Sequence, residues 1–87
     1  TPAEQRKTVD FVKTFLTAKL ERKVERQDID VAILAAKALE DANNRQLAAE
    51  AYEAFADLIS KGNDEMFLDS VKMMEGAAQR LQASGTD

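Results

Sequence analysis

Helix-breaking residues are scarce in this chain, which contains three glycines and one proline among its 87 residues. These two residue types are the ones that a helix interior tolerates least. Along most of the chain, apolar side chains recur three and four residues apart, which is the spacing that aligns them along one face of an α-helix. The sequence therefore predicts an all-α fold.

The expected first helix begins at Thr1, a capping residue that is followed by a proline suited to the first helical turn. Its apolar stripe predicts that the helix runs to about Val24. Asp28 is expected to cap a second helix, in which residues 31–39 are apolar on nearly every side. A helix of that kind is usually contacted on more than one face, so we expect it to be central.

The third helix is expected to start directly after Asn43 and Asn44, because asparagine tolerates the left-handed conformation and also caps helices. Gly62 is expected to end this helix. Asn63, with two acidic residues after it, is then expected to cap a fourth helix.

Four helices with short connections are expected to be antiparallel to their neighbours. They can form an up-and-down bundle or two stacked helical hairpins similar to tetratricopeptide (TPR) repeats. In either arrangement, Leu39 and Phe55 are expected in one shared core. We expect a single four-helix domain over residues 1–83, followed at residues 84–87 by a linker or an artificial chain end.

Cysteine and histidine are both absent, which excludes disulfides, thiolate metal sites and most acid–base catalysts that work near neutral pH. The carboxylates show no spacing typical of an acid–base pair. Asp28 and Asp30 lack the glycine and the distal glutamate of a calcium loop. The sequence therefore predicts no catalytic residue, no metal site and no cofactor, so the chain is not expected to be an enzyme.

A basic cluster is predicted on one face of the first helix, because its members are spaced by three and four residues: Lys19, Arg22, Lys23 and Arg26. Residues 1–27 carry seven basic and four acidic side chains, although the whole chain has a net charge of −4. The cluster is either a docking face for a partner or an internal counterpart of the acidic later helices. Nucleic acid is not an expected partner, since the rest of the surface is acidic.

Two methionines, Met66 and Met73, are seven residues apart and are expected along one edge of the fourth helix. Such an edge can be an adaptable docking surface, but methionine also fills irregular cores. No apolar run approaches the roughly 20 residues that a bilayer-spanning helix needs, so no membrane partner is expected.

Two stretches in the C-terminal half carry a family resemblance: residues 46–60, QLAAEAYEAFADLIS, and residues 73–81, MMEGAAQRL. They resemble the helical segment that precedes the thioredoxin-like domain in bacterial redoxin-type thiol–disulfide oxidoreductases. In that family the chemistry belongs to a Cys-x-x-Cys motif on the following α/β domain, and no residue of this chain matches that motif. The resemblance implies an accessory domain of a larger protein of the periplasm or cell envelope.

The sequence thus predicts a non-catalytic helical accessory or interaction domain, monomeric or weakly dimeric, whose partner is a protein. The resemblance implies that the partner is a downstream thioredoxin-like domain. The alternative is a free-standing adaptor that docks an acidic protein through its basic first helix or its methionine edge. The candidate docking residues are Lys19, Arg22, Lys23, Arg26, Met66 and Met73.

Overall fold

The computed structural model describes residues 1–84, so residues 85–87 of the predicted linker lie outside it. In chain order the described elements are α1 (Pro2–Leu20), α2 (Arg26–Asp41), α3 (Arg45–Ser60), the short 3-10 helix η1 (Glu65–Phe67) and α4 (Leu68–Ser84). No strand occurs in this part of the chain, and the predicted all-α fold is confirmed. The last helix includes Ser84, which the sequence assigns to the linker.

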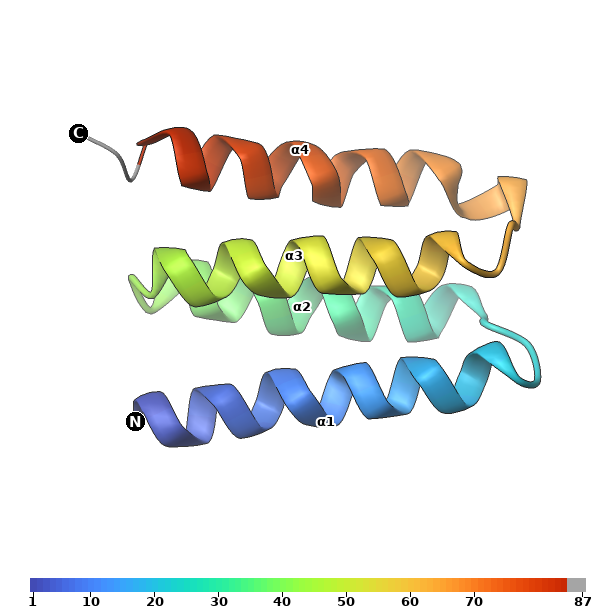
Figure 1. Ribbon diagram of the computed structural model, residues 1–87, viewed down its shortest axis with the longest axis horizontal. Coiled ribbons are helices and arrows are strands. Elements are labelled where there is room, and N and C mark those ends of the chain that lie inside the picture. Colours follow the sequence, from blue (N-terminus) through green and yellow to red (C-terminus); the bar gives the residue numbers. More distant parts are fainter. Residues whose placement is uncertain (85–87) are drawn as a thin grey trace.

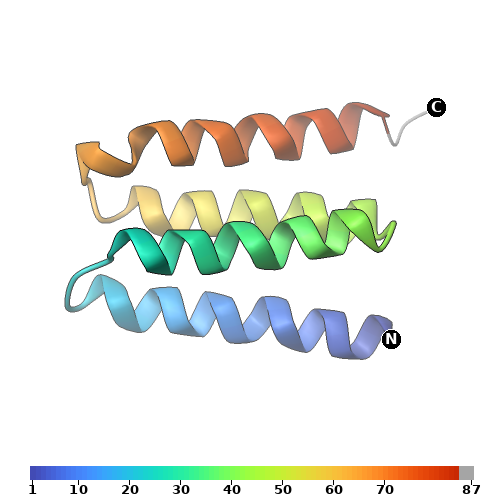
Figure 2. The same ribbon diagram turned by 180° about the vertical axis from the view of Figure 1, so that it is seen from behind.

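Consecutive helices run antiparallel, and their axes lie side by side in both views (Figures 1 and 2). Helix α3 contacts each of the other three helices, and its contact with α4 is the most extensive. All four helices contribute to one hydrophobic core, which contains Leu39 and Phe55 as predicted. The fold is therefore a compact helical bundle with up-and-down connectivity.

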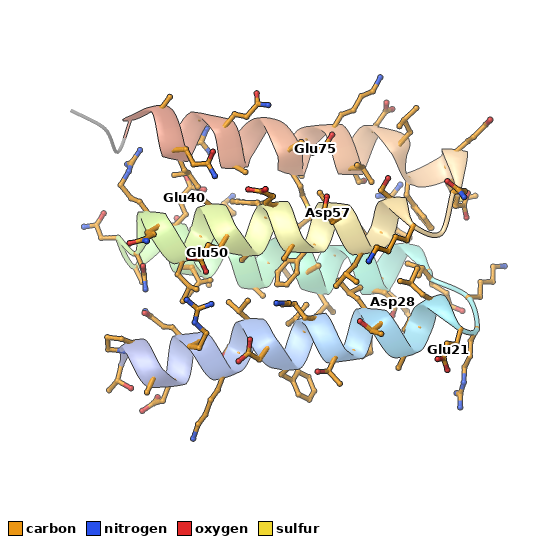
Figure 3. All side chains as sticks on the ribbon, in the orientation of Figure 1. Glu21, Asp28, Glu40, Glu50, Asp57 and Glu75 are labelled. Carbon is orange, nitrogen blue, oxygen red and sulfur yellow. The ribbon has the colours of Figure 1, made fainter. Side chains whose placement is uncertain are left out.

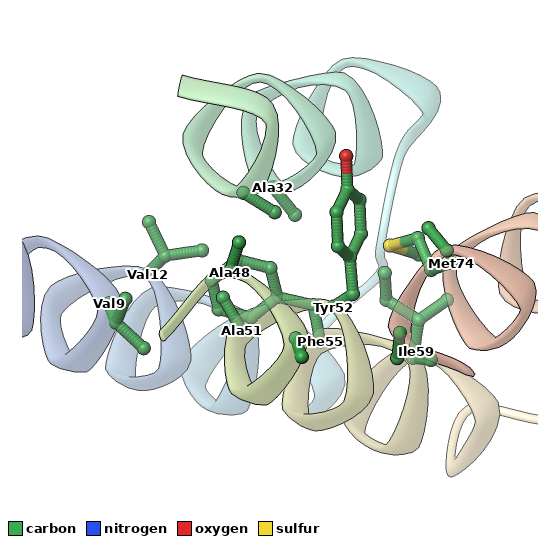
Figure 4. Close-up of a cluster of buried hydrophobic side chains, with 14 of the residues drawn as sticks. Val9, Val12, Ala32, Ala48, Ala51, Tyr52, Phe55, Ile59 and Met74 are labelled. Carbon is green, nitrogen blue, oxygen red and sulfur yellow. The ribbon is translucent and has the colours of Figure 1, made fainter. Parts of the chain in front are cut away.

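Helix α3 is central because small and apolar side chains cover most of its circumference. Its buried alanines are Ala48, Ala49, Ala51 and Ala56. Small side chains at a contact let helix axes approach closely. Between the alanines stand the buried rings of Phe55 and Tyr52, and Tyr52 points from α3 into the space between α2 and α4 (Figure 4).

The expectation of a central second helix is wrong. Val31 and Leu34 of α2 are exposed to solvent, and α3 takes the central position instead. Both helices are rich in alanine and apolar residues. Which of them is enclosed depends on how each helix is rotated against its neighbours, and spacing within one helix does not report that rotation.

Helix α1 ends at Leu20 and does not reach Val24, because a capping box begins α2 only five residues later. Glu25 is the N-cap of α2, and its N–H donates to the Asp28 carboxylate at 2.8 Å. Asp28 therefore occupies the third helical position and not the predicted cap position. Val24 lies in the connection, where it packs against the core.

The turn between α2 and α3 agrees with the sequence prediction. Asn43 has a positive φ of 65°. The side chain of Asn44 caps α3 by accepting a hydrogen bond from the N–H of Leu47 at 3.3 Å. Both roles follow from the short polar side chain of asparagine.

The turn after α3 differs from the prediction. Helix α3 ends at Ser60, just before Gly62, but it is Asn63, with a φ of 54°, that takes the left-handed conformation. The next cap is Asp64, whose carboxylate accepts from the N–H of Met66 at 3.0 Å. This cap starts η1, so Asn63 does not cap the fourth helix directly. Asparagine can either adopt the left-handed conformation of a turn or cap a helix, and the neighbouring residues determine which role it takes.

The packing predicts different costs for truncating two phenylalanines. Phe55 is fully buried in the core, whereas Phe11 on α1 is 70% exposed. Phe55→Ala should lower the free energy of unfolding by about 3–5 kcal/mol, since it leaves a cavity. Phe11→Ala removes the same atoms from the surface and should change it by less than about 0.5 kcal/mol. Urea unfolding followed by circular dichroism measures both, and equal effects would contradict this packing.

Candidate functional site

The four basic candidate residues do not share a helix face. Only Lys19 belongs to α1, since Arg22 and Lys23 lie in the connection that follows it. Arg26 is the first residue of α2. The prediction of one basic face is wrong because it required the first helix to continue through residue 26.

Lys19 has contacts within the molecule. Its ammonium group lies 3.8 Å from a carboxylate oxygen of the buried Asp28 and 5.8 Å from the centre of the Phe15 ring. The Asp28 carboxylate also accepts the N–H of Glu25. Lys19 therefore supplies the counter-charge for a carboxylate that starts α2, as the internal alternative proposed.

Arg26 is also engaged inside the chain. Its guanidinium donates to the Ser70 hydroxyl at 2.9 Å and lies 5.3 Å from the centre of the Phe67 ring. A guanidinium at this distance from an aromatic ring makes a favourable cation–π contact. The side chain thus joins the start of α2 to η1 and the start of α4.

Arg22 and Lys23, like Arg26, are exposed. Within the described residues the side chains of Arg22 and Lys23 have no ion pair and no side-chain hydrogen bond. They border a shallow hollow of about 180 Å³, which is also lined by Asp64 and Phe67. The hollow is small for a binding pocket, so these two cations are available only for contacts at the surface.

The two methionine candidates are exposed at different kinds of position. Met66, 69% exposed, belongs to the 3-10 helix η1, and Met73, 46% exposed, belongs to α4. Their seven-residue spacing would place them on one face only in a continuous α-helix. Met74 is buried in the core. The docking role of Met66 and Met73 stays a prediction.

A polar network that sequence reasoning missed connects three helices. The buried Tyr52 of α3 donates its hydroxyl hydrogen to Glu40 of α2 at 3.3 Å. The other carboxylate oxygen of Glu40 accepts from Arg80 of α4 at 3.0 Å. Tyr52 and Glu40 are twelve residues apart, Glu40 and Arg80 forty. Tyr52, Glu40 and Arg80 meet because α2, α3 and α4 pack at heights that bring these three residues together.

The network shifts the pKa values of two of its members. The hydrogen bond from Arg80 lowers the pKa of Glu40, an effect that partial burial opposes. Burial, followed by the negative charge of Glu40, raises the pKa of Tyr52. The carboxylate is thus kept ionised and the phenol protonated. The pair and Arg80 thus connect α2, α3 and α4 by hydrogen bonds.

Acidic side chains line a groove of about 330 Å³ between α3 and α4, where Figure 3 labels Asp57 and Glu75. Glu53 lies in the same groove and accepts a hydrogen bond from Gln82 at 3.3 Å. Across residues 1–84, no group of three acidic side chains is placed to hold a metal ion.

The largest exposed apolar side chains on the first two helices are Phe11, Val31 and Leu34, exposed by 70%, 47% and 66%. On α1, Phe11 is rotated away from the buried Val9 and Val12. We call the exposed surface of the neighbouring helices α1 and α2 that carries Phe11, Val31 and Leu34 the α1–α2 face. One signal was present in the sequence, because Phe11 falls outside the apolar stripe of its helix.

Comparison with known proteins found no matching family model, no matching curated protein and no matching solved structure. None of the described helices combines the length and the apolar character that crossing a membrane requires. The interpretation of this surface therefore rests on its own geometry.

Titration of the single tyrosine tests the polar network directly. Because the folded pKa of Tyr52 is raised above its ordinary 10.0, the stability it contributes is full below pH 10.0 and is lost as pH rises further. Phenolate absorbance should show a higher midpoint for the native chain than for the chain in urea. Glu40→Gln should lower the native midpoint, since it removes the neighbouring charge. The same midpoint in the native and urea-unfolded states would contradict the network.

Proposed function

We propose that this chain is a non-catalytic protein-interaction domain and that its α1–α2 face is the contact surface. The observation that carries the proposal is the exposure of Phe11, Val31 and Leu34 on two neighbouring helices. The described residues contain no buried side-chain polar atom without a hydrogen-bond partner. Large exposed apolar side chains that gather on one face are typical of interaction sites.

The resemblance supports a setting for this interaction. We place the domain in a larger thiol–disulfide oxidoreductase of the cell envelope, in which a thioredoxin-like domain carries the redox cysteines. This chain has no cysteine and cannot form the thiolate that such chemistry needs. Its contribution would be to contact another folded unit of that protein, in the same copy or in another.

The alternative is a free-standing adaptor for an acidic protein. The observation that favours it is the exposure of Arg22 and Lys23, which have no side-chain partner within the described residues. Met66 adds exposed apolar surface next to Phe67, which lines the same hollow as Arg22 and Lys23. Lys19 and Arg26 contribute little to this alternative, because they are engaged internally.

Hydroxyl-radical footprinting distinguishes the two proposals, because phenylalanine, leucine and methionine side chains all report their exposure. The reading frame beyond Asp87 is first sequenced, and the longer protein is expressed if a Cys-x-x-Cys domain follows. We expect Phe11 and Leu34 to become several-fold less reactive in the longer protein than in the dilute isolated chain. Met66 and Met73 serve as internal controls and should keep their reactivity.

Equal reactivity of Phe11 and Leu34 in both samples would overturn the proposed contact surface. Protection of Met66 when a separate acidic protein is added to the isolated chain would favour the adaptor, and reversal of Arg22 and Lys23 to glutamate should then weaken that binding in a salt-dependent way. A reading frame without a thioredoxin-like domain would overturn the proposed setting.

A further inference from the structure

Phe11 and Leu34 stand at nearly the same height on two antiparallel helices. The register of α1 against α2 is indicated by the ion pair of Lys19 with Asp28 at 3.8 Å, and the surface hollow that Thr8 and Ala35 both line agrees with it. Phe11 follows Thr8 by three residues, and Leu34 precedes Ala35 by one. With a rise of about 1.5 Å per residue, the two side chains lie within about 3 Å of one height. Both side chains are exposed at this height on neighbouring helices, and we call them the apolar centre of the α1–α2 face.

The charges around this centre are self-complementary. Asp30 precedes Leu34 by four residues, and Lys37 follows it by three. Residues at these spacings lie on the same side of a helix as Leu34. Neither Asp30 nor Lys37 has an ion pair or a side-chain hydrogen bond within residues 1–84. Both charges are thus available to a partner, one on each side of the apolar centre.

We propose that the α1–α2 face binds a second copy of this chain about a two-fold axis that passes near Leu34, perpendicular to the helices. The axis places α2 antiparallel to α2 of the second copy. Because Leu34 lies almost midway between Asp30 and Lys37, Asp30 then meets Lys37 of the second copy, and the reverse pair forms symmetrically. Phe11 of each copy meets the other near the same axis, as an aromatic pair.

This inference rests on the proposed function, since it names the partner of the same face. A pair of opposite charges that flanks an apolar centre gives an orientation as well as attraction, because the parallel arrangement would bring like charges together. The apolar centre is small compared with a stable interface, which buries about 1,200–2,000 Å² in total. The dimer should therefore be weak and in exchange, with a dissociation constant on the order of 10–1,000 µM.

Analytical ultracentrifugation of the isolated chain tests the dimer. The protein concentration should range from about 10 µM to 2 mM, which brackets the expected dissociation constant. The average mass should rise from that of the 9.6 kDa monomer toward twice this value. Leu34→Glu places like charges at the axis and should weaken the dimer at least about tenfold. Met73→Glu introduces the same charge on α4 and should leave it unchanged. Circular dichroism verifies that both variants fold.

A charge swap tests the orientation. Asp30→Lys or Lys37→Asp alone should weaken the dimer about three- to tenfold, because each brings two like-charge pairs together. The double variant Asp30→Lys with Lys37→Asp restores opposite charges and should regain most of the affinity. Failure of the double variant to recover would overturn the two-fold arrangement.

A chain that stays monomeric throughout the concentration range would overturn the second-copy inference, as would a dimer that Leu34→Glu leaves intact. Either result still allows protection of Phe11 in the longer protein, which would retain the proposed function with a different partner. A dimer that follows these expectations, with no protection of Phe11 in the longer protein, would retain the α1–α2 face as a contact surface of the isolated chain and overturn its proposed use in the longer protein.

Discussion

The enclosure of α3 by the other three helices is the constraint on which the rest of this structure depends. A helix can be contacted on three sides only if its side chains are small or apolar around most of its circumference, and α3 meets this condition through its alanines. The close approach of α4 follows from it. So does the location of Phe55, which is fully buried where the helices converge.

Polar contacts then adjust the relative heights of the helices. Arg26 joins the start of α2 to that of α4 through Ser70, and Glu40 joins their C-terminal halves through Arg80. Helices α1 and α3 are held in register by the exposed pair of Arg6 and Glu50 at 3.0 Å. Surface pairs of this kind contribute little to stability, about 0–1 kcal/mol each, so they adjust a packing that the apolar core establishes. The outer surface of α1 and α2 is not used by any of these contacts, which leaves the α1–α2 face open.

The helical class, most turns and the burial of Leu39 and Phe55 could be predicted from the sequence, whereas the rotation and the height of each helix against its neighbours could not. The all-α class followed from apolar spacing, and the caps at Thr1 and Asn44 followed from local residue chemistry. The end of α1 was misplaced because periodicity alone did not weigh the capping box at Glu25, and the proposed basic face failed with it. The pairing of Tyr52 with Glu40 and the exposure of Leu34 depend on helix rotation and height. Those quantities are determined only when the helices pack.

Native-state hydrogen exchange tests the central place of α3 most directly, because it measures the opening free energy of each helix separately. Amide hydrogens around Ala51 and Phe55 should exchange only by global unfolding, with an opening free energy equal to that from urea unfolding. The amides of α1 and α4 that lie on exposed turns should exchange through smaller openings. An α3 that opens at a lower free energy than α1 or α4 would contradict the account.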